Sequence, residues 1–278
     1  MKIFLDSAKL DEIAYCYSAR IVDGVTTNPS LLKKAVDELK AKGKRVELLS
    51  YIKEILRVAK GTPVSLEVSS FAYEKMVEEG KRLYRIFNPV ARNVYIKIPV
   101  NPSFSDEPST DGLKAIRTLT AAGIPVNCTL IHTPEQALLA AKAGAKIVSL
   151  FAGRVDDRIR ELNNIQFQKG DYFPAYGWRK DNTILEDNGI ISGIELVRQT
   201  VEIKKKYGFN AQVLAASMRN PRQVREAALV GADIATCPFD VIKGCLQHPK
   251  TEEGMRRFTA DVVPEYAVLG LKRKVRKQ

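Results

Sequence analysis

The chain has 278 residues, of which 45% are apolar and 27% are charged, a composition typical of a globular protein. This balance excludes wholesale disorder and collagen-like or low-complexity architectures. The 44 lysines and arginines outnumber the 32 aspartates and glutamates, so the net charge is +12. A surface with this charge favours anionic partners, which include nucleic acid, phosphorylated metabolites and acidic membranes.

Short apolar, β-branched runs alternate with amphipathic segments along the whole chain. Helices are expected between the runs, as at Pro134–Ala143 and Pro221–Val230, and Gly123, Gly144 and Gly231 fit left-handed helix C-caps before the next strand. The candidate strands are Lys2–Asp6, Gly24–Asn28, Val64–Val68, Val94–Val100, Pro125–Leu130, Lys146–Phe151, Gln212–Ser217 and Ile234–Cys237.

Strand–helix alternation on this scale predicts an α/β fold with a parallel sheet, because parallel crossovers need a dozen or more residues. Eight such units favour a single closed (β/α)8 TIM barrel over residues 1–265, followed by a basic C-terminal tail, 266–278. No G-x-G-x-x-G follows the first strand, which weakens the alternative of an open dinucleotide-binding sheet.

Two longer segments interrupt the alternation, and they are expected as extended loops after strands 4 and 6. They are Asn101–Thr110 and Arg158–Asn188, the second of which holds the one tryptophan, Trp178. Loops at the carboxyl ends of barrel strands build active sites, although a surface excursion or an oligomer contact is equally compatible with these two. The tail carries five positive charges within Lys272–Lys277, compatible with a solvated terminus or with an anion contact.

The sequence predicts a cytoplasmic protein with no membrane span. The first apolar run is too short for a signal peptide, and no apolar stretch reaches 18 residues. The four cysteines form no C-x-x-C pair, which favours free thiols in a reduced compartment. With only His132 and His248 as histidines, a His-rich metal site or a Ser-His-Asp triad has little support, and we expect no metal.

Polar residues interrupt the predicted strands near their carboxyl ends, where they should converge at the barrel mouth. Lys97 is the most informative, because its strand should be buried on both faces. Burial lowers a lysine's pKa and leaves a neutral amine able to form a Schiff base with a carbonyl. A purely structural ion pair with Glu67 or Asp6 is the equally weighted alternative.

A second constellation closes the seventh strand and opens the next helix, at Ala215–Pro221. Free backbone N–H groups, the hydroxyl of Ser217 and the guanidinium of Arg219 predict an anion site, to which Arg154 could add a second guanidinium. Helix capping with a surface arginine is the alternative. The neighbouring pair Asp156-Asp157 is interpreted as a solvated turn rather than a metal site.

Seven short motifs resemble those of the transaldolase family, and they occur in order across nearly the whole chain. They are Phe4–Ala8, Asp23–Ser30, Ile96–Pro99, Val126–Leu130, Phe151–Asp157, Ala216–Asn220 and Thr236–Phe239. The Thr-Thr-Asn-Pro and Lys-Ile-Pro elements together are specific to this family.

The resemblance implies a role for each matching residue and implies that no cofactor is needed. The Schiff-base lysine falls on Lys97 and the C4-hydroxyl acid/base on Asp6. Glu67 would act through a water that Thr129 positions. The substrate-binding residues that the resemblance implies are Asn28, Asn127, Ser149 and Phe151 around the dihydroxyacetone unit, and Arg154, Ser217 and Arg219 at the phosphate.

The family contains two chemistries. Transaldolases transfer dihydroxyacetone between a ketose phosphate and an aldose phosphate, whereas the fructose-6-phosphate aldolases release it free and typically carry Gln and Tyr where this chain has Glu67 and Phe151. The resemblance therefore implies a transaldolase of the pentose phosphate pathway, acting on sugar phosphates and forming a homo-oligomer. The rivals are the aldolase and an anion- or nucleic-acid-binding protein on an inactive barrel. We expect sugar phosphates, rather than nucleic acid, as the partners.

Overall fold

The computed structural model describes residues 1–269, and within that range eight parallel strands close into a barrel with the order β1-β10-β9-β6-β5-β4-β3-β2. The predicted TIM-barrel architecture is confirmed. The barrel strands are β1 (Lys2–Asp6), β2 (Gly24–Thr26), β3 (Val64–Glu67), β4 (Val94–Pro99), β5 (Val126–Ile131), β6 (Ile147–Leu150), β9 (Gln212–Ala215) and β10 (Ile234–Cys237).

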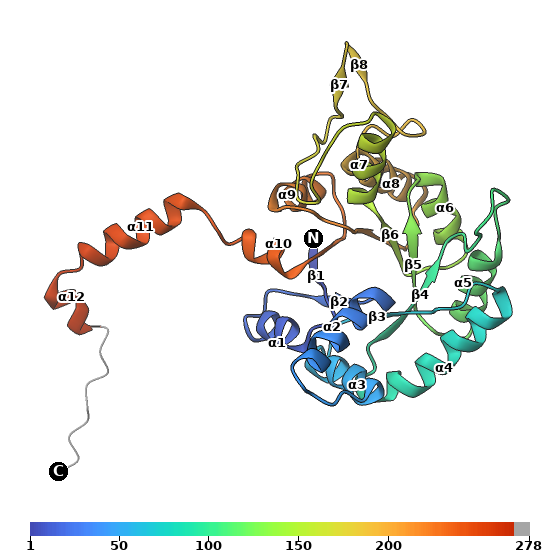
Figure 1. The fold of residues 1–278 in the computed structure, drawn as a ribbon, viewed down its shortest axis with the longest axis horizontal. Coiled ribbons are helices and arrows are strands. Elements are labelled where there is room, and N and C mark those ends of the chain that lie inside the picture. Colours follow the sequence, from blue (N-terminus) through green and yellow to red (C-terminus); the bar gives the residue numbers. More distant parts are fainter. Residues whose placement is uncertain (270–278) are drawn as a thin grey trace. The chain divides into compact units, whose positions relative to one another are not determined.

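Helices alternate with these strands and surround them, as the colour sequence in Figure 1 shows from β1 in blue to β6 in green. They are α1 (Leu10–Ser18), α2 (Pro29–Ala41), α3 (Leu48–Val58), α4 (Tyr73–Ala91), α5 (Asp111–Ala121), α6 (Pro134–Lys142), α7 (Ala152–Leu162), α8 (Gly193–Tyr207), α9 (Pro221–Leu229) and α10 (Phe239–Gly244).

Local sequence signals set the helix boundaries. The side chains of Asn28, Thr133 and Asn220 each accept a hydrogen bond from a backbone N–H of the helix that follows, and each is followed by proline at the first helical position. The three predicted C-terminal glycines adopt positive φ values, of 75° at Gly123, 102° at Gly144 and 89° at Gly231. These caps turn each helix directly into the next strand.

The second predicted loop is wrong in its first residues. Residues 158–162 continue helix α7, because Val155 and Ile159 are four residues apart and bury one helix face against the core. The long connection therefore runs from residue 163 to 192 and leaves α7, not strand β6. It contains a hairpin of β7 (Arg179–Lys180) and β8 (Thr183–Ile184), which projects from the barrel in Figure 1.

The barrel interior has two layers, which follow from the alternation of side chains along each strand. The lower layer is apolar: Phe4, Ile147, Leu214 and Ile234 are at most 1% exposed and pack together. Gly24 leaves room there for the Phe4 ring, since a Cβ on Gly24 would lie 2.6 Å from that ring. Two residues further along, β1, β6 and β10 place the polar side chains of Asp6, Ser149 and Thr236 in the cavity, so the apolar layer forms the floor of a largely polar mouth.

Internal contacts divide the chain into two units, residues 1–242 and 243–278. The second unit holds α11 (Pro249–Ala260) and α12 (Pro264–Leu269). The sequence-based division at residue 265 stays a prediction, and the basic residues Lys272–Lys277 lie outside the described residues. Between residues 1 and 269 no helix combines the length and the apolar character needed to cross a bilayer. The cytoplasmic location and the homo-oligomer also stay predictions.

Candidate active site

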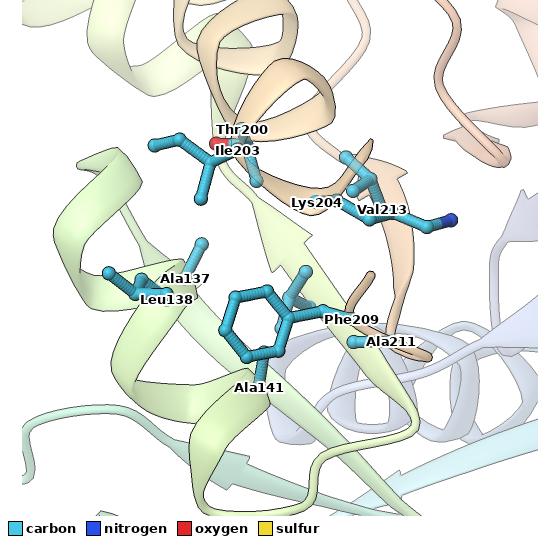
Figure 2. A pocket seen from close by; sticks show the side chains of 10 residues that line it. Ala137, Leu138, Ala141, Thr200, Ile203, Lys204, Phe209, Ala211 and Val213 are labelled. Carbon is cyan, nitrogen blue, oxygen red and sulfur yellow. The ribbon is translucent and has the colours of Figure 1, made fainter. Parts of the chain in front are cut away.

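A cavity of about 450 Å³ opens at the carboxyl ends of the barrel strands, a volume suited to a small metabolite. All the residues predicted for the site line it except Asn127. They are Asp6, Asn28, Glu67, Lys97, Thr129, Ser149, Phe151, Arg154, Ser217 and Arg219. A recess between α6 and α8, lined by Leu138, Ile203 and Phe209 (Figure 2), holds only about 10 Å³, too little for a metabolite.

Lys97, on β4, is one of the residues that line this cavity. Its side chain is 7% exposed, and its Nζ lies 3.0 Å from Oε2 of Glu67. The strand register explains the pair, since Glu67 of β3 stands opposite Lys97 of β4. The same Nζ donates to the carbonyl of Thr27 at 3.2 Å. An amine in this position has both a carboxylate to take its proton and an open cavity in front of it.

Asp6 ends β1, three strands from β4 around the barrel, and two threonines form a relay of hydroxyls behind it. The hydroxyl of Thr26 donates to Oδ1 of Asp6 at 2.7 Å and lies 2.6 Å from the hydroxyl of Thr236. Burial raises the pKa of Asp6, whereas the Thr26 hydrogen bond and the positive charges of Lys97 and Lys169 lower it. The carboxyl is therefore placed to exchange a proton with a ligand.

Of the two inward-facing polar residues of β5, Asn127 is bonded within the barrel and Thr129 lines the cavity. Asn127 donates to the hydroxyl of Ser65 at 3.1 Å and accepts from the hydroxyl of Ser149 at 2.7 Å. Both ends of its amide are thus used within the barrel, beneath the cavity. Thr129 is fully buried and lines the cavity, and its hydroxyl has no partner among the described residues. A buried hydroxyl without a partner needs a water or a ligand group.

The opposite end of the cavity is cationic. Ser217 has a left-handed φ of 64°, which is uncommon for a non-glycine residue and turns the chain sharply after β9. Arg219 pairs with Asp157 through its Nη2, and its buried Nε has no partner among the described residues. Burial lowers the pKa of Arg219, and Asp157 opposes that effect. Arg154 adds an exposed guanidinium to the lining.

Two of the lining residues do structural work as well. The Oδ1 of Asn28 caps α2 by accepting from the N–H of Leu31 at 2.9 Å, so its Nδ2 is the group left to donate to a ligand. Phe151 precedes α7 and packs against the apolar floor, with the His132 ring 5.6 Å from its own. It therefore gives the cavity one apolar wall.

A family model described as Transaldolase/Fructose-6-phosphate aldolase matches residues 3–271. The chain belongs to this family. It is 42% identical over 261 residues to probable transaldolases of Desulfatibacillum aliphaticivorans and Thermodesulfovibrio yellowstonii, covering 94% of this chain and 97% of each relative. A probable transaldolase of Thermoplasma acidophilum is 40% identical, over 94% of this chain and 95% of its own length. The resemblance drawn from the motifs is confirmed.

In this transaldolase-family chain, Asp156 and Asp157 do not form the solvated turn expected from sequence. Asp156 is 2% exposed and accepts from the N–H of Gly193 at 2.7 Å and from Nε2 of Gln223 at 2.8 Å. Burial raises the pKa of Asp156 to about 7. Gln223 in turn accepts from the backbone N–H of Arg219 at 2.8 Å, so the pair fastens the turn after β9 to α7 and α8.

Sequence reasoning assigned no role to three further lining residues, Thr26, Thr236 and Lys169. The two threonines lie within the quoted family motifs, and their position opposite Asp6 follows only from the register of β1 with β2 and β10. Lys169 lies on the 163–192 connection, where no sequence pattern distinguishes it from Lys180, the other lysine of that connection.

Proposed function

We propose that this protein is a transaldolase that transfers a dihydroxyacetone unit through a Schiff base on Lys97. Its substrates are sugar phosphates: sedoheptulose 7-phosphate or fructose 6-phosphate as donor, and glyceraldehyde 3-phosphate or erythrose 4-phosphate as acceptor. The observation that carries the proposal is Lys97 itself, a buried amine beside Glu67 in a cavity that also contains Asp6 and a cationic end.

In the first half-reaction the amine of Lys97 adds to the C2 carbonyl of the ketose phosphate, and loss of water leaves an iminium ion. Asp6 then accepts the proton of the C4 hydroxyl while the C3–C4 bond breaks. The electron pair of the C3–C4 bond moves into the iminium, which becomes an enamine, and the aldose phosphate leaves. Addition of the enamine to a second aldose phosphate and hydrolysis of the imine complete the transfer.

Glu67 and Thr129 support the proton and water steps. Glu67 lies within hydrogen-bond distance of the Lys97 amine, so it can take a proton from the amine and return one to the leaving water. The unpartnered hydroxyl of Thr129 gives that water a second contact. Arg154, Ser217 and Arg219 hold the substrate phosphate at the other end, since guanidinium groups bind phosphate by paired, charge-assisted hydrogen bonds.

Phe151 favours transfer over release of free dihydroxyacetone. Its apolar ring brings no hydroxyl to the cavity, and so keeps water and protons away from the enamine until an acceptor aldehyde arrives. Fructose-6-phosphate aldolase activity is the alternative within the same family.

The two activities differ in acceptor dependence. With fructose 6-phosphate as donor, we expect rapid sedoheptulose 7-phosphate formation when erythrose 4-phosphate is present, and only slow release of dihydroxyacetone without an acceptor. Both products are measured by coupled enzymatic assays over the same time course. Fast, sustained dihydroxyacetone release without acceptor would replace the transaldolase proposal by the aldolase.

The hydroxyl relay behind Asp6 predicts a shift in the pH dependence of the reaction. Thr26→Val removes the hydrogen bond that lowers the pKa of Asp6, so that pKa rises. Because the cleavage step needs ionised Asp6, the acid limb of the kcat/KM profile should move to higher pH. Thr26→Ser keeps the hydroxyl and should keep the wild-type profile. Identical profiles for Thr26→Val and wild type would rule out Asp6 as the base.

A further inference from the structure

The connection between α7 and α8, residues 163–192, carries Lys169 to the mouth of the cavity. The proposed mechanism leaves this lysine without a role. Its side chain is exposed, so its ammonium is accessible to a ligand that enters from solvent. The contacts around it show that its position is built into the fold.

A tight turn presents Lys169 and Gly170 at its tip. The N–H of Asp171 donates to the carbonyl of Gln168 at 3.0 Å, and the N–H of Gln168 donates to Oδ2 of Asp171 at 2.8 Å. These two bonds close the turn from both sides, so the two residues between them are held outward.

Arg160 of α7 braces the turn from below. Its guanidinium is 2% exposed, and its Nη2 donates to the carbonyls of Asp171 at 3.1 Å and Tyr172 at 3.0 Å. The rings of Phe167 and Phe173 stack on the same guanidinium, with centroids 4.9 and 5.0 Å away. A buried charge with this many contacts fixes the segment on both sides of the turn.

The far side of the turn is tied to α9. Tyr172 donates to Oε1 of Glu226 at 2.8 Å, and the guanidinium of Arg222 covers its ring at 3.8 Å. Asn220, which caps α9, donates to the carbonyl of Gly170 at 3.4 Å. Since Asn220 directly follows Arg219, the turn tip lies beside the cationic end of the cavity.

We propose that Lys169 is a further cationic ligand for the substrate phosphate, which the braced turn of the 163–192 connection holds beside Ser217 and Arg219. This inference rests on the proposed transfer of sugar phosphates and adds a binding residue that lies outside the barrel elements. Its positive charge also reaches Asp6 on the neighbouring wall, where it lowers the pKa of that carboxyl. Lys169 thus lines the same cavity as Asp6 and Arg219, and the substrate phosphate is the anion that we expect its ammonium to bind.

Kinetics with paired substrates test this role. In Lys169→Met, we expect the KM for fructose 6-phosphate to rise about tenfold, the effect of losing one charge-assisted contact of about 1.4 kcal/mol, with kcat nearly unchanged. At a pH above the acid limb, where Asp6 is ionised in both proteins, turnover of unphosphorylated fructose should be the same as in wild type. Lys169→Arg keeps the charge and should restore most of the affinity. Lys180→Met, on β7 of the same connection and outside the cavity lining, is the matched control.

A binding measurement separates this proposal from the proposed function. Inorganic phosphate, titrated by calorimetry into wild type and into each variant, should bind more weakly to Lys169→Met alone. If the wild type has no transferase activity but still binds phosphate more tightly than Lys169→Met does, the proposed function is overturned and the phosphate contact of Lys169 is retained. An active wild type with unchanged phosphate affinity and KM in Lys169→Met would overturn the Lys169 proposal. A shifted pH profile of kcat/KM in Lys169→Met with unchanged phosphate affinity would also overturn the proposal. Lys169 would then act on the pKa of Asp6 and not on the phosphate.

Discussion

Replacing Lys97 with methionine should reduce transferase activity by at least about a thousandfold, in the range seen when a covalent nucleophile is removed. Methionine keeps about the same side-chain volume, one atom shorter than lysine, but it has no amine and cannot form an imine. The wild-type enzyme, incubated with fructose 6-phosphate and reduced with borohydride, should carry a stable adduct on Lys97. Mass spectrometry of the digested protein locates that adduct.

Two controls make the Lys97 result interpretable. Lys146→Met changes an exposed lysine just before β6 and should leave both activity and adduct unchanged. Lys97→Met leaves Glu67 without its ion-pair partner, so its urea unfolding midpoint must be compared with that of the wild type. A folded Lys97→Met that still transfers dihydroxyacetone, or an adduct on a different lysine, would refute the Schiff-base assignment.

Gly153→Ala should destabilise the protein and weaken phosphate binding together. A Cβ on Gly153 would lie 2.1 Å from the carbonyl oxygen of Ser217 and 2.7 Å from Nε of Arg219. The first of these atoms is backbone, so relief requires the Ser217 turn itself to move. Overpacking of this kind costs about 1–3 kcal/mol of unfolding free energy. The KM for fructose 6-phosphate should rise as well, because both displaced residues line the cavity.

The matched control for this substitution is Gly254→Ala in α11, where an added Cβ meets no atom within 4 Å. Since alanine is the better helix former, this variant should be as stable as wild type or slightly more stable. Urea unfolding midpoints and KM values for fructose 6-phosphate, measured for wild type, Gly153→Ala and Gly254→Ala, test this prediction. A Gly153→Ala variant with wild-type stability and KM would show that the turn after β9 can move freely, contrary to its close packing against Gly153.

Periodicity and local motifs were enough to predict the barrel. The bounds predicted for β1 and β10 agree with the structure because strand alternation and flanking turn residues are local signals. Residues 158–162 were missed as helix because aromatic and polar residues downstream dominated the composition of that stretch. The buried face that Val155 and Ile159 form was the signal that could have shown α7.

The candidate site was less accessible to sequence reasoning where it depends on pairing between strands. Alternation placed Asn127 and Thr129 on one face, but only the register shows that Asn127 is held by Ser65 and Ser149 beneath the cavity. In the same way, Thr26 and Thr236 contact each other although they are 210 residues apart. Lys169 reaches the cavity through contacts of Arg160 with backbone carbonyls, which leave no pattern in the sequence.

The apolar floor beneath the polar mouth restricts the route by which small molecules enter and leave the barrel. Phe4, Ile147, Leu214 and Ile234 plug the interior below Lys97, with Phe4 seated over Gly24. In the proposed transfer, the sugar phosphate, the departing aldose phosphate and the water of imine hydrolysis would then share one portal, which passes the cationic side chains of Arg154 and Lys169. Arrival and departure thus run through the same electrostatic field, which speeds capture of an anion and slows its escape.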